Sequence, residues 1–162
     1  MTTNESEIYV KPDQGESYSV LGDLYTIKVQ SAATLGAYGL LEVVFQPQGG
    51  APPHYHEQEN ESFYILEGEI EFQVAEKTYI ASAGSFVHIP KGKIHSFINK
   101  CQTPVKALVW VTPGGLEKFF AEVGTKVEDP LFPPPLNPAD MERLPRIAAN
   151  YGLQLITTED NK

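Results

Sequence analysis

The sequence of 162 residues is poor in cysteine and contains no long hydrophobic run. Cys101 is its single cysteine, which excludes an intrachain disulfide and a zinc site built from four cysteines. No apolar stretch approaches the ~18 residues that a membrane-spanning helix needs. We therefore expect a chain with one hydrophobic core and no segment that crosses a membrane.

Basic residues are also scarce, because 12 Lys and Arg stand against 21 Asp and Glu, giving a net charge of -9. An acidic surface repels phosphate groups, so neither nucleic acid nor an anionic membrane is expected as a partner. The first ten residues, MTTNESEIYV, show neither the basic nor the apolar segment of a secretory signal peptide. We expect a cytoplasmic protein, with which a lone thiol is compatible.

The chain divides into three parts, and its length suits a single domain. Residues 1–17 are polar and predict a flexible N-terminal arm. Residues 18–112 predict about eight short strands separated by turn residues, which is typical of an all-β barrel or sandwich. Residues 113–162 predict a C-terminal helical tail with a proline-rich link, and we place this tail in the same domain as the barrel.

Two helices are expected in the tail. Apolar residues recur at helical spacing over residues 116–124, where Gly124 is a natural stop. Residues 129–138 contain too many prolines for a helix or a sheet and predict an extended link. A second helix is expected over residues 137–152, with Asn137 as its cap, and Pro145 should kink it or split it in two.

Two histidines, His54 and His56, stand one residue apart after a pair of prolines. Residues i and i+2 of a strand face the same side, so both imidazoles can point into a barrel and converge on one ion. The preceding prolines stiffen this approach and reduce the entropy that is lost when the side chains are ordered. The pair therefore predicts half of a metal site.

Three acids follow the histidines and compete for the role of carboxylate ligand. Glu57 points away from His56 if the strand continues, and Glu59 lies in the connecting loop. Glu61 begins a strand in which it shares a face with Phe63, and it therefore points inward if the aromatic ring does. We favour Glu61 and place Glu59 second.

A further histidine, His95, begins the strand that ends at Asn99 in the segment GSFVHIPKGKIHSFIN, residues 84–99. Three histidines and one carboxylate on separate strands match the chemistry of first-row divalent metals. Four protein ligands leave coordination positions free for water, substrate or dioxygen, which is typical of a catalytic site and not of a structural one.

These residues resemble the cupin family over roughly residues 35–112. The first cupin motif is matched by His54, His56, Glu61 and Gly68, although Gln48 stands where the pattern has its leading glycine. The second motif is matched in full by Gly84, Pro90, Gly92, His95 and Asn99. The resemblance implies a double-stranded β-helix, or jelly-roll, barrel.

The segment VTPGGLEKFFAEVG and the proline-rich link are similar to bacterial quercetin 2,3-dioxygenase-like cupins. This resemblance implies that His54, His56, Glu61 and His95 bind one divalent transition metal, which can be Fe, Mn, Ni, Co, Cu or Zn. It implies that Glu61 also contacts the flavonol hydroxyl and takes its proton, which makes Glu61 the candidate catalytic residue. It further implies dioxygen as co-substrate and a homodimer.

The favoured function is a metal-dependent dioxygenase that acts on a flavonol or a similar enolisable aromatic substrate. One alternative is a cupin isomerase or lyase for a small sugar or keto acid, but no cluster of Lys, Arg and Tyr accompanies the ligands. The other alternative is a cupin that binds a small ligand without catalysis, because the fold alone does not define the function.

The remaining conspicuous residues have structural interpretations. His88 lies outside both motifs and is expected in the pocket wall, beside the ligands or on the surface. Cys101 predicts an inert thiol, since only Lys100 beside it is cationic. Trp110 should pack between the sheet and the tail helix or at a subunit interface. The barrel should be filled mainly by Phe63, Ile65, Phe97, Val109 and Val111.

Overall fold

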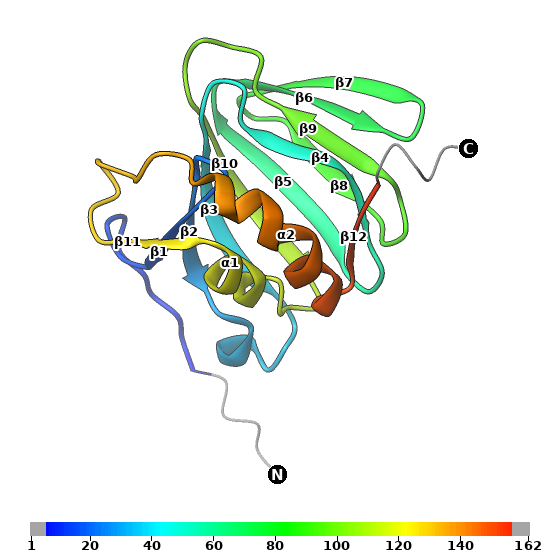
Figure 1. Ribbon diagram of the computed structural model, residues 1–162. Helices are drawn as coiled ribbons and strands as arrows, with labels where there is room; N and C mark the ends of the chain where they lie inside the picture. Colours follow the sequence, from blue (N-terminus) through cyan, green and yellow to red (C-terminus); the bar gives the residue numbers. More distant parts are fainter. Residues whose placement is uncertain (1–5, 157–162) are drawn as a thin grey trace.

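The computed structural model describes residues 6–156 of the chain, and two antiparallel β-sheets dominate it (Figure 1). The strands are β1 (Glu16–Val20), β2 (Asp23–Val29), β3 (Gly39–Phe45), β4 (Gly50–His56), β5 (Asn60–Glu67), β6 (Glu69–Val74), β7 (Lys77–Ser82), β8 (Phe86–Ile89), β9 (His95–Ile98), β10 (Val105–Thr112), β11 (Thr125–Val127) and β12 (Leu153–Leu155). The helices are η1 (Ser31–Thr34), α1 (Glu117–Val123) and α2 (Pro138–Asn150).

The larger sheet has the strand order β11-β1-β2-β3-β10-β5-β8, and the smaller sheet has the order β12-β4-β9-β6-β7. Each sheet interleaves strands that are distant in sequence, as in a jelly roll. The predicted all-β, double-stranded β-helix barrel with a C-terminal helical tail is therefore confirmed. Within residues 6–156 the strands outnumber the expected eight, partly because the short strands β1, β11 and β12 were not foreseen.

The core lies between the two sheets, and strict alternation along the strands builds it. In β10 every second residue is buried and its neighbours are half-buried, so one face of the strand points into the barrel. The residues expected to fill the barrel are buried, which confirms that expectation: Phe63, Ile65, Phe97, Val109 and Val111. The parity that buries Phe63 also turns Glu61 inward.

The tail lies across the open side of the barrel and completes both sheets (Figure 1). Strand β11 pairs with β1, and strand β12 pairs with β4 so that Leu153 faces His56 and Leu155 faces His54. Glu16 and Ser17, at the end of the expected arm 1–17, already belong to β1. Parts of the arm and of the tail, residues 1–5 and 157–162, lie outside the described residues.

Helix α2 begins as expected, because the side chain of Asn137 accepts a hydrogen bond of 3.1 Å from the backbone N–H of Ala139. The expected split at Pro145 is wrong, since α2 continues as one helix to Asn150. Pro145 removes the donor for the carbonyl group of Met141, but this turn is exposed, so water can bind that carbonyl. None of the helices within residues 6–156 has the length and apolar character needed to cross a membrane.

A tight turn joins β3 to β4 and brings the chain to the histidine-bearing segment. Gln48, which replaces the expected motif glycine, adopts a left-handed backbone with φ of 66°. Its N–H donates a 2.8 Å hydrogen bond to the carbonyl of Asn99. At Gly50 a Cβ atom would lie 2.0 Å from the carbonyl oxygen of Phe97, so only glycine fits. The chain thus turns between β3 and β4 without the leading glycine of the motif.

Candidate metal centre

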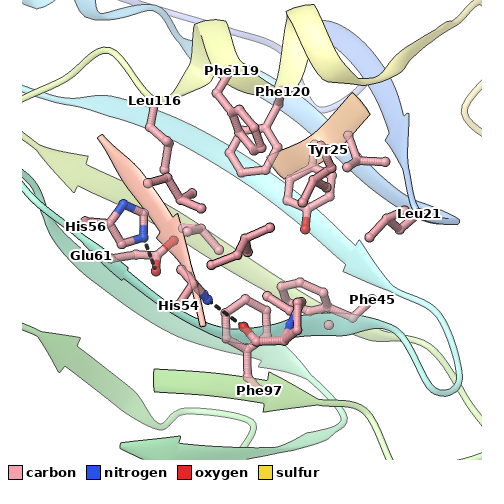
Figure 2. A pocket seen from close by; sticks show the side chains of 18 of the residues that line it. Leu21, Tyr25, Phe45, His54, His56, Glu61, Phe97, Leu116, Phe119 and Phe120 are labelled. Atoms are coloured by element: carbon pink, nitrogen blue, oxygen red, sulfur yellow. Dashed lines mark hydrogen bonds and ion pairs between the residues drawn. The ribbon is translucent and has the colours of Figure 1, made fainter. Parts of the chain in front are cut away.

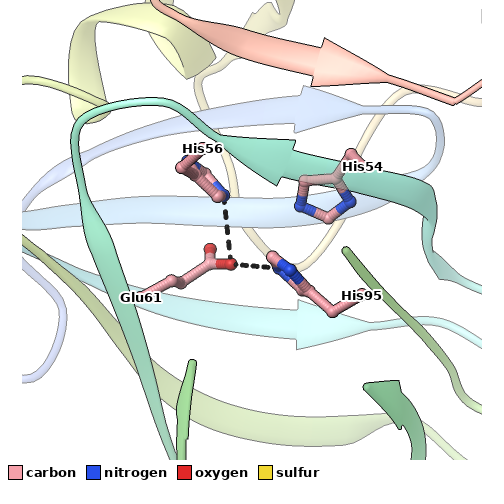
Figure 3. A group of neighbouring side chains, drawn as sticks. All are labelled: His54, His56, Glu61 and His95. Carbon is pink, nitrogen blue, oxygen red and sulfur yellow. Dashed lines mark hydrogen bonds and ion pairs between the residues drawn. The ribbon is translucent and has the colours of Figure 1, made fainter. Parts of the chain in front are cut away.

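Four side chains from three strands converge between the sheets (Figure 3). Strand β4 carries His54 and His56, β5 carries Glu61, and β9 carries His95. One nitrogen or oxygen atom from each residue lies within 4.8 Å of the others, and the four residues are only 1–4% exposed. The structure therefore brings together all four residues that the sequence indicated.

The carboxylate of Glu61 lies at the centre of this cluster. Its Oε2 atom is 3.0 Å from Nε2 of His95 and 3.3 Å from Nε2 of His56. The ring of His54 packs at a centroid distance of 4.2 Å from the ring of His95. Three imidazoles and one carboxylate thus share a space from which most water is excluded.

Backbone carbonyls orient two of the three imidazoles. Nδ1 of His54 lies 2.8 Å from the carbonyl oxygen of Pro52, and Nδ1 of His95 lies 2.9 Å from that of Lys93. A carbonyl oxygen can only accept, so Nδ1 carries the hydrogen in both rings and Nε2 offers its lone pair to the cluster. This is the tautomer that a metal ion requires.

His56 differs, because neither of its ring nitrogens has a hydrogen-bond partner within the described residues. The nearby Oε2 of Glu59 is buried and also has no such partner there. A buried polar atom without a partner costs about 1–3 kcal/mol, so native structures contain few of them. An ion bound at Nε2 of His56 would satisfy one of these atoms, and the donor set therefore fits a divalent metal.

Burial and the buried carboxylate set the protonation states of the cluster. Burial lowers the pKa of His54 to about 4, so this ring is neutral at ordinary pH. Burial would lower the pKa of His56 as well, but the charge of Glu61 outweighs it and raises the pKa. Burial would raise the pKa of Glu61, yet the adjacent His56 and His95 hold it well below its usual range.

The two competing acids lie elsewhere. Glu57 is exposed, and its carboxylate accepts a 3.0 Å hydrogen bond from Gln154. Glu59 is buried behind His56, on the side of Nδ1, at 3.8 Å. Burial raises the pKa of Glu59.

The other residues singled out in the sequence lie away from the cluster. His88 is exposed, and its Nδ1 is 2.9 Å from the hydroxyl oxygen of Ser62 on the outer face of the larger sheet. Trp110 lies on this same face and stacks on Phe86 at a centroid distance of 5.8 Å. Cys101 is a half-buried free thiol.

An apolar pocket opens directly onto three of the four clustered residues, His54, His56 and Glu61 (Figure 2). The volume of the cavity is only about 60 Å³. The interior is therefore a narrow slot. Its remaining walls are almost entirely apolar, and they include Phe45, Phe63, Phe97, Leu116, Phe119, Phe120, Leu144, Leu153 and Leu155.

Sequence reasoning did not find two features of this pocket. Tyr25 from β2 adds a hydroxyl group to the otherwise apolar wall, and its ring stacks on Phe120 at 4.2 Å. The tail supplies a large part of the wall through Leu116, Leu144 and Leu155. The helical periodicity of the tail indicated an apolar face, but it did not decide whether that face covers one end of the barrel or packs on a partner.

Comparisons with known proteins agree with this architecture. The family model of the cupin domain matches residues 41–111. Quercetin 2,3-dioxygenase of Bacillus subtilis (strain 168) is 33% identical over 81 residues, which are 49% of this chain and 23% of that protein. The chain thus matches less than a quarter of the length of this relative.

Solved structures share the fold at low identity. KdgF from Halomonas sp. superposes with a TM-score of 0.61 and 14% identity, over 70% of this chain and 98% of that chain. The polyketide cyclase RemF from Streptomyces resistomycificus gives a TM-score of 0.58 and 20% identity, over 66% and 80% of the two chains. Together with the two sequence motifs, the family match identifies residues 41–111 as a cupin domain, and the solved structures share its fold.

Proposed function

We propose that this cupin binds one divalent transition metal through His54, His56, Glu61 and His95 and acts as a dioxygenase on an enolisable aromatic substrate such as a flavonol. The observation that carries the proposal is the narrow apolar slot that ends at the buried four-residue cluster. The similarity to quercetin 2,3-dioxygenase over 81 residues supports this choice of reaction.

The pocket walls favour a flat, apolar substrate. The aromatic side chains of Phe63, Phe97 and Phe120 can pack against the faces and edges of a ring system. Among the described lining residues there is neither Lys nor Arg, so no cation is available there to bind a phosphate or a carboxylate. The hydroxyl group of Tyr25 can orient a substrate that carries a polar substituent.

Glu61 is the candidate proton acceptor. Oε2 lies 3.3 Å from Nε2 of His56 and 3.0 Å from Nε2 of His95, which leaves Oε1 to receive a substrate hydroxyl at the pocket wall. The low pKa keeps the carboxylate ionised, which makes it able to accept a proton but only a weak base. Proton transfer is therefore expected from an acidic enolic hydroxyl and not from an ordinary alcohol.

The metal, when bound, supplies Lewis-acid activation of the enolic oxygen and a redox partner for dioxygen. The chain itself supplies the surroundings. Leu116 and Phe119 from the tail cover the slot and exclude water from the cluster. His54 and His95 are held by backbone carbonyls, so their lone pairs are oriented before any ion arrives.

A second candidate is a non-oxidative isomerase or lyase, or a cupin that binds a small ligand without turnover. The shared fold with RemF supports this candidate, because RemF is a polyketide cyclase. An apolar slot would serve such a substrate equally well. We further propose, from the cupin resemblance and the sequence, that the protein is a cytoplasmic homodimer.

Oxygen consumption separates these functions. Purified protein loaded in turn with Fe²⁺, Mn²⁺, Co²⁺, Ni²⁺, Cu²⁺ or Zn²⁺ is mixed with quercetin in an oxygen-electrode cell, with Glu61→Gln and the exposed Glu57→Gln as matched variants. The proposal predicts stoichiometric oxygen uptake that Glu61→Gln abolishes and Glu57→Gln preserves. Binding or conversion of substrate without oxygen uptake would establish the second candidate instead.

A further inference from the structure

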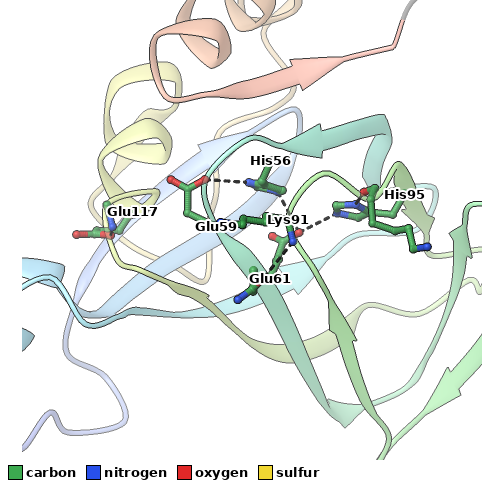
Figure 4. Close-up of polar contacts among 9 residues, drawn as sticks. His56, Glu59, Glu61, Lys91, His95 and Glu117 are labelled. Atoms are coloured by element: carbon green, nitrogen blue, oxygen red, sulfur yellow. Dashed lines mark hydrogen bonds and ion pairs between the residues drawn. The ribbon is translucent and has the colours of Figure 1, made fainter.

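Glu59 lies beside the cluster without taking part in it. It occupies the loop between β4 and β5, three residues after His56, and it is 9% exposed. Its Oε2 atom is 3.8 Å from Nδ1 of His56, on the side of the ring away from Glu61 (Figure 4). The Oε2 of Glu59 and the Nδ1 of His56 are both buried, and both lack a hydrogen-bond partner within residues 6–156.

The other two histidines show what is missing at His56. His54 and His95 each direct Nδ1 at the backbone carbonyl of the residue two positions earlier, Pro52 or Lys93, at 2.8 and 2.9 Å. Nδ1 of His56 has no hydrogen-bonded carbonyl partner within the described chain. The acceptor that faces it is the carboxylate of Glu59.

The loop that carries Glu59 is held in place from two sides. The backbone N–H of Glu57 donates a 2.8 Å hydrogen bond to the carbonyl of Gly152, next to β12. The N–H of Gly92 donates a 2.7 Å hydrogen bond to the carbonyl of His56. The position of Glu59 is therefore built into the fold, and its side chain needs to move by about 1 Å to reach an ordinary N–H···O distance.

We infer that Glu59 is a positioning residue, whose carboxylate accepts the Nδ1–H of His56 and so presents Nε2 of that ring to the metal. This inference rests on the metal centre proposed above, but not on dioxygenase activity. A carboxylate behind an imidazole fixes its tautomer and increases its basicity as a ligand. His56 would then be a stronger donor than His54 and His95, which have neutral carbonyl partners.

If Glu59 has this role, its removal should lower metal affinity but should not lower the stability of the metal-free protein. Loss of the carboxylate behind a ligating histidine weakens metal binding by about 10- to 100-fold. Without metal, however, Oε2 of Glu59 is a buried atom without a hydrogen-bond partner among the described residues, which destabilises the fold. Glu59→Ala and Glu59→Gln should therefore bind metal more weakly, while the thermal midpoint of the metal-free variants equals or exceeds that of the wild type.

The test uses Co²⁺ alone and the full-length chain. The affinity for Co²⁺ is measured by competition with a chelator. The visible absorption bands of bound Co²⁺ report the donor strength of His56. Stability is measured by thermal unfolding with and without the ion. Glu57→Gln is the matched control, since Glu57 is in the same loop but exposed. We expect about 10- to 100-fold weaker binding and shifted bands in Glu59→Ala, a smaller loss in Glu59→Gln, and wild-type behaviour of Glu57→Gln.

Any of the following results would overturn the inference, and each would do so for a different reason. Equal affinities and equal spectra of wild type and Glu59→Ala would show that Glu59 has no effect on His56. Complete loss of Co²⁺ from Glu59→Ala would make Glu59 a ligand, and a lower thermal midpoint of the metal-free variants would make its role structural. Absence of Co²⁺ binding in the wild type would refute the metal centre itself and the role of Glu59 with it.

Discussion

Glu61 and His95 face each other through Oε2 and Nε2. Both atoms are hydrogen-bond acceptors when the carboxyl group is ionised and the imidazole is neutral with its hydrogen on Nδ1. Oε2 of Glu61 is 3.0 Å from Nε2 of His95, whose hydrogen is placed on Nδ1 by the carbonyl of Lys93. A carboxylate oxygen and an imidazole lone pair repel each other at this distance unless a proton or a metal ion lies between them. The contact therefore needs a proton or a metal ion between these two atoms, and for a metal ion the neighbouring His54 and His56 would supply further donors.

Removal of the hydroxyl group of Tyr25 should affect substrate binding and leave the fold intact. The ring is 7% exposed and stacks on Phe120, and Tyr25→Phe preserves this contact. Loss of one hydrogen bond to the substrate should raise KM by about 3- to 10-fold with little change in kcat. Steady-state kinetics test this prediction. For a substrate analogue without hydroxyl groups, the wild type and Tyr25→Phe should have the same KM. An unchanged KM for the hydroxylated substrate would remove Tyr25 from the recognition of the substrate.

Asn99, the last residue of the second motif, should be important for stability and not for metal binding. It is fully buried, its amide group donates to the carbonyls of Phe45 and Thr103, and its Oδ1 accepts from the N–H of Cys101. Asn99→Ala leaves these backbone groups without partners, so the free energy of unfolding should fall by about 2–4 kcal/mol. Urea unfolding measures this loss, with the exposed Gln102→Ala as control. Loss of metal at unchanged stability would contradict this assignment.

Asp23 should make stability depend on pH. Its carboxyl group is buried and accepts 2.8 Å hydrogen bonds from the N–H groups of Gln46 and Gly50. Burial raises the pKa of Asp23 to about 7, and the two hydrogen bonds offset only part of that shift. Between about pH 4 and 7 the folded chain thus keeps a proton that the unfolded chain has lost, so the free energy of unfolding falls by up to ~1.4 kcal/mol per pH unit.

The variant Asp23→Asn isolates this contribution, because an amide does not titrate. The stability of the wild type relative to Asp23→Asn should decrease from pH 4 to pH 7 and stay constant above pH 7. Urea unfolding at closely spaced pH values measures the difference, in which the titration of the histidines cancels. A difference that does not vary with pH would show that Asp23 is ionised throughout this range in the folded protein.

The barrel and the four clustered residues were predictable because they depend on local rules. Strand parity alone turns Glu61 to the same side as Phe63, and the structure buries both. The motif residues are spaced by turns whose backbone requirements are visible in the sequence. Gln48 shows the limit of such rules, since its left-handed backbone is imposed by the hydrogen bond to Asn99 and not by its own preference.

Features that depend on contacts between distant segments were not predictable. Strand β12 has only three residues, too few to show alternation, and it forms because β4 offers an edge beside His54 and His56. The orientation of Glu59 toward His56 depends on a loop that is anchored to Gly152 and Gly92, far away in the sequence. Sequence parity could rank Glu59 below Glu61 as a ligand, but it could not place it behind the ring.

The central claim is that His54, His56, Glu61 and His95 hold one metal ion. Elemental analysis of the purified protein tests it most directly when it is performed in parallel on His54→Ala, Glu61→Ala and His88→Ala, with thermal unfolding to confirm that each variant is folded. His88 is the matched control, because it is a histidine on the outer face. We predict about one divalent ion per chain in the wild type and in His88→Ala, and at most a small fraction of that in folded His54→Ala and Glu61→Ala. The same metal content in all four proteins would contradict the account.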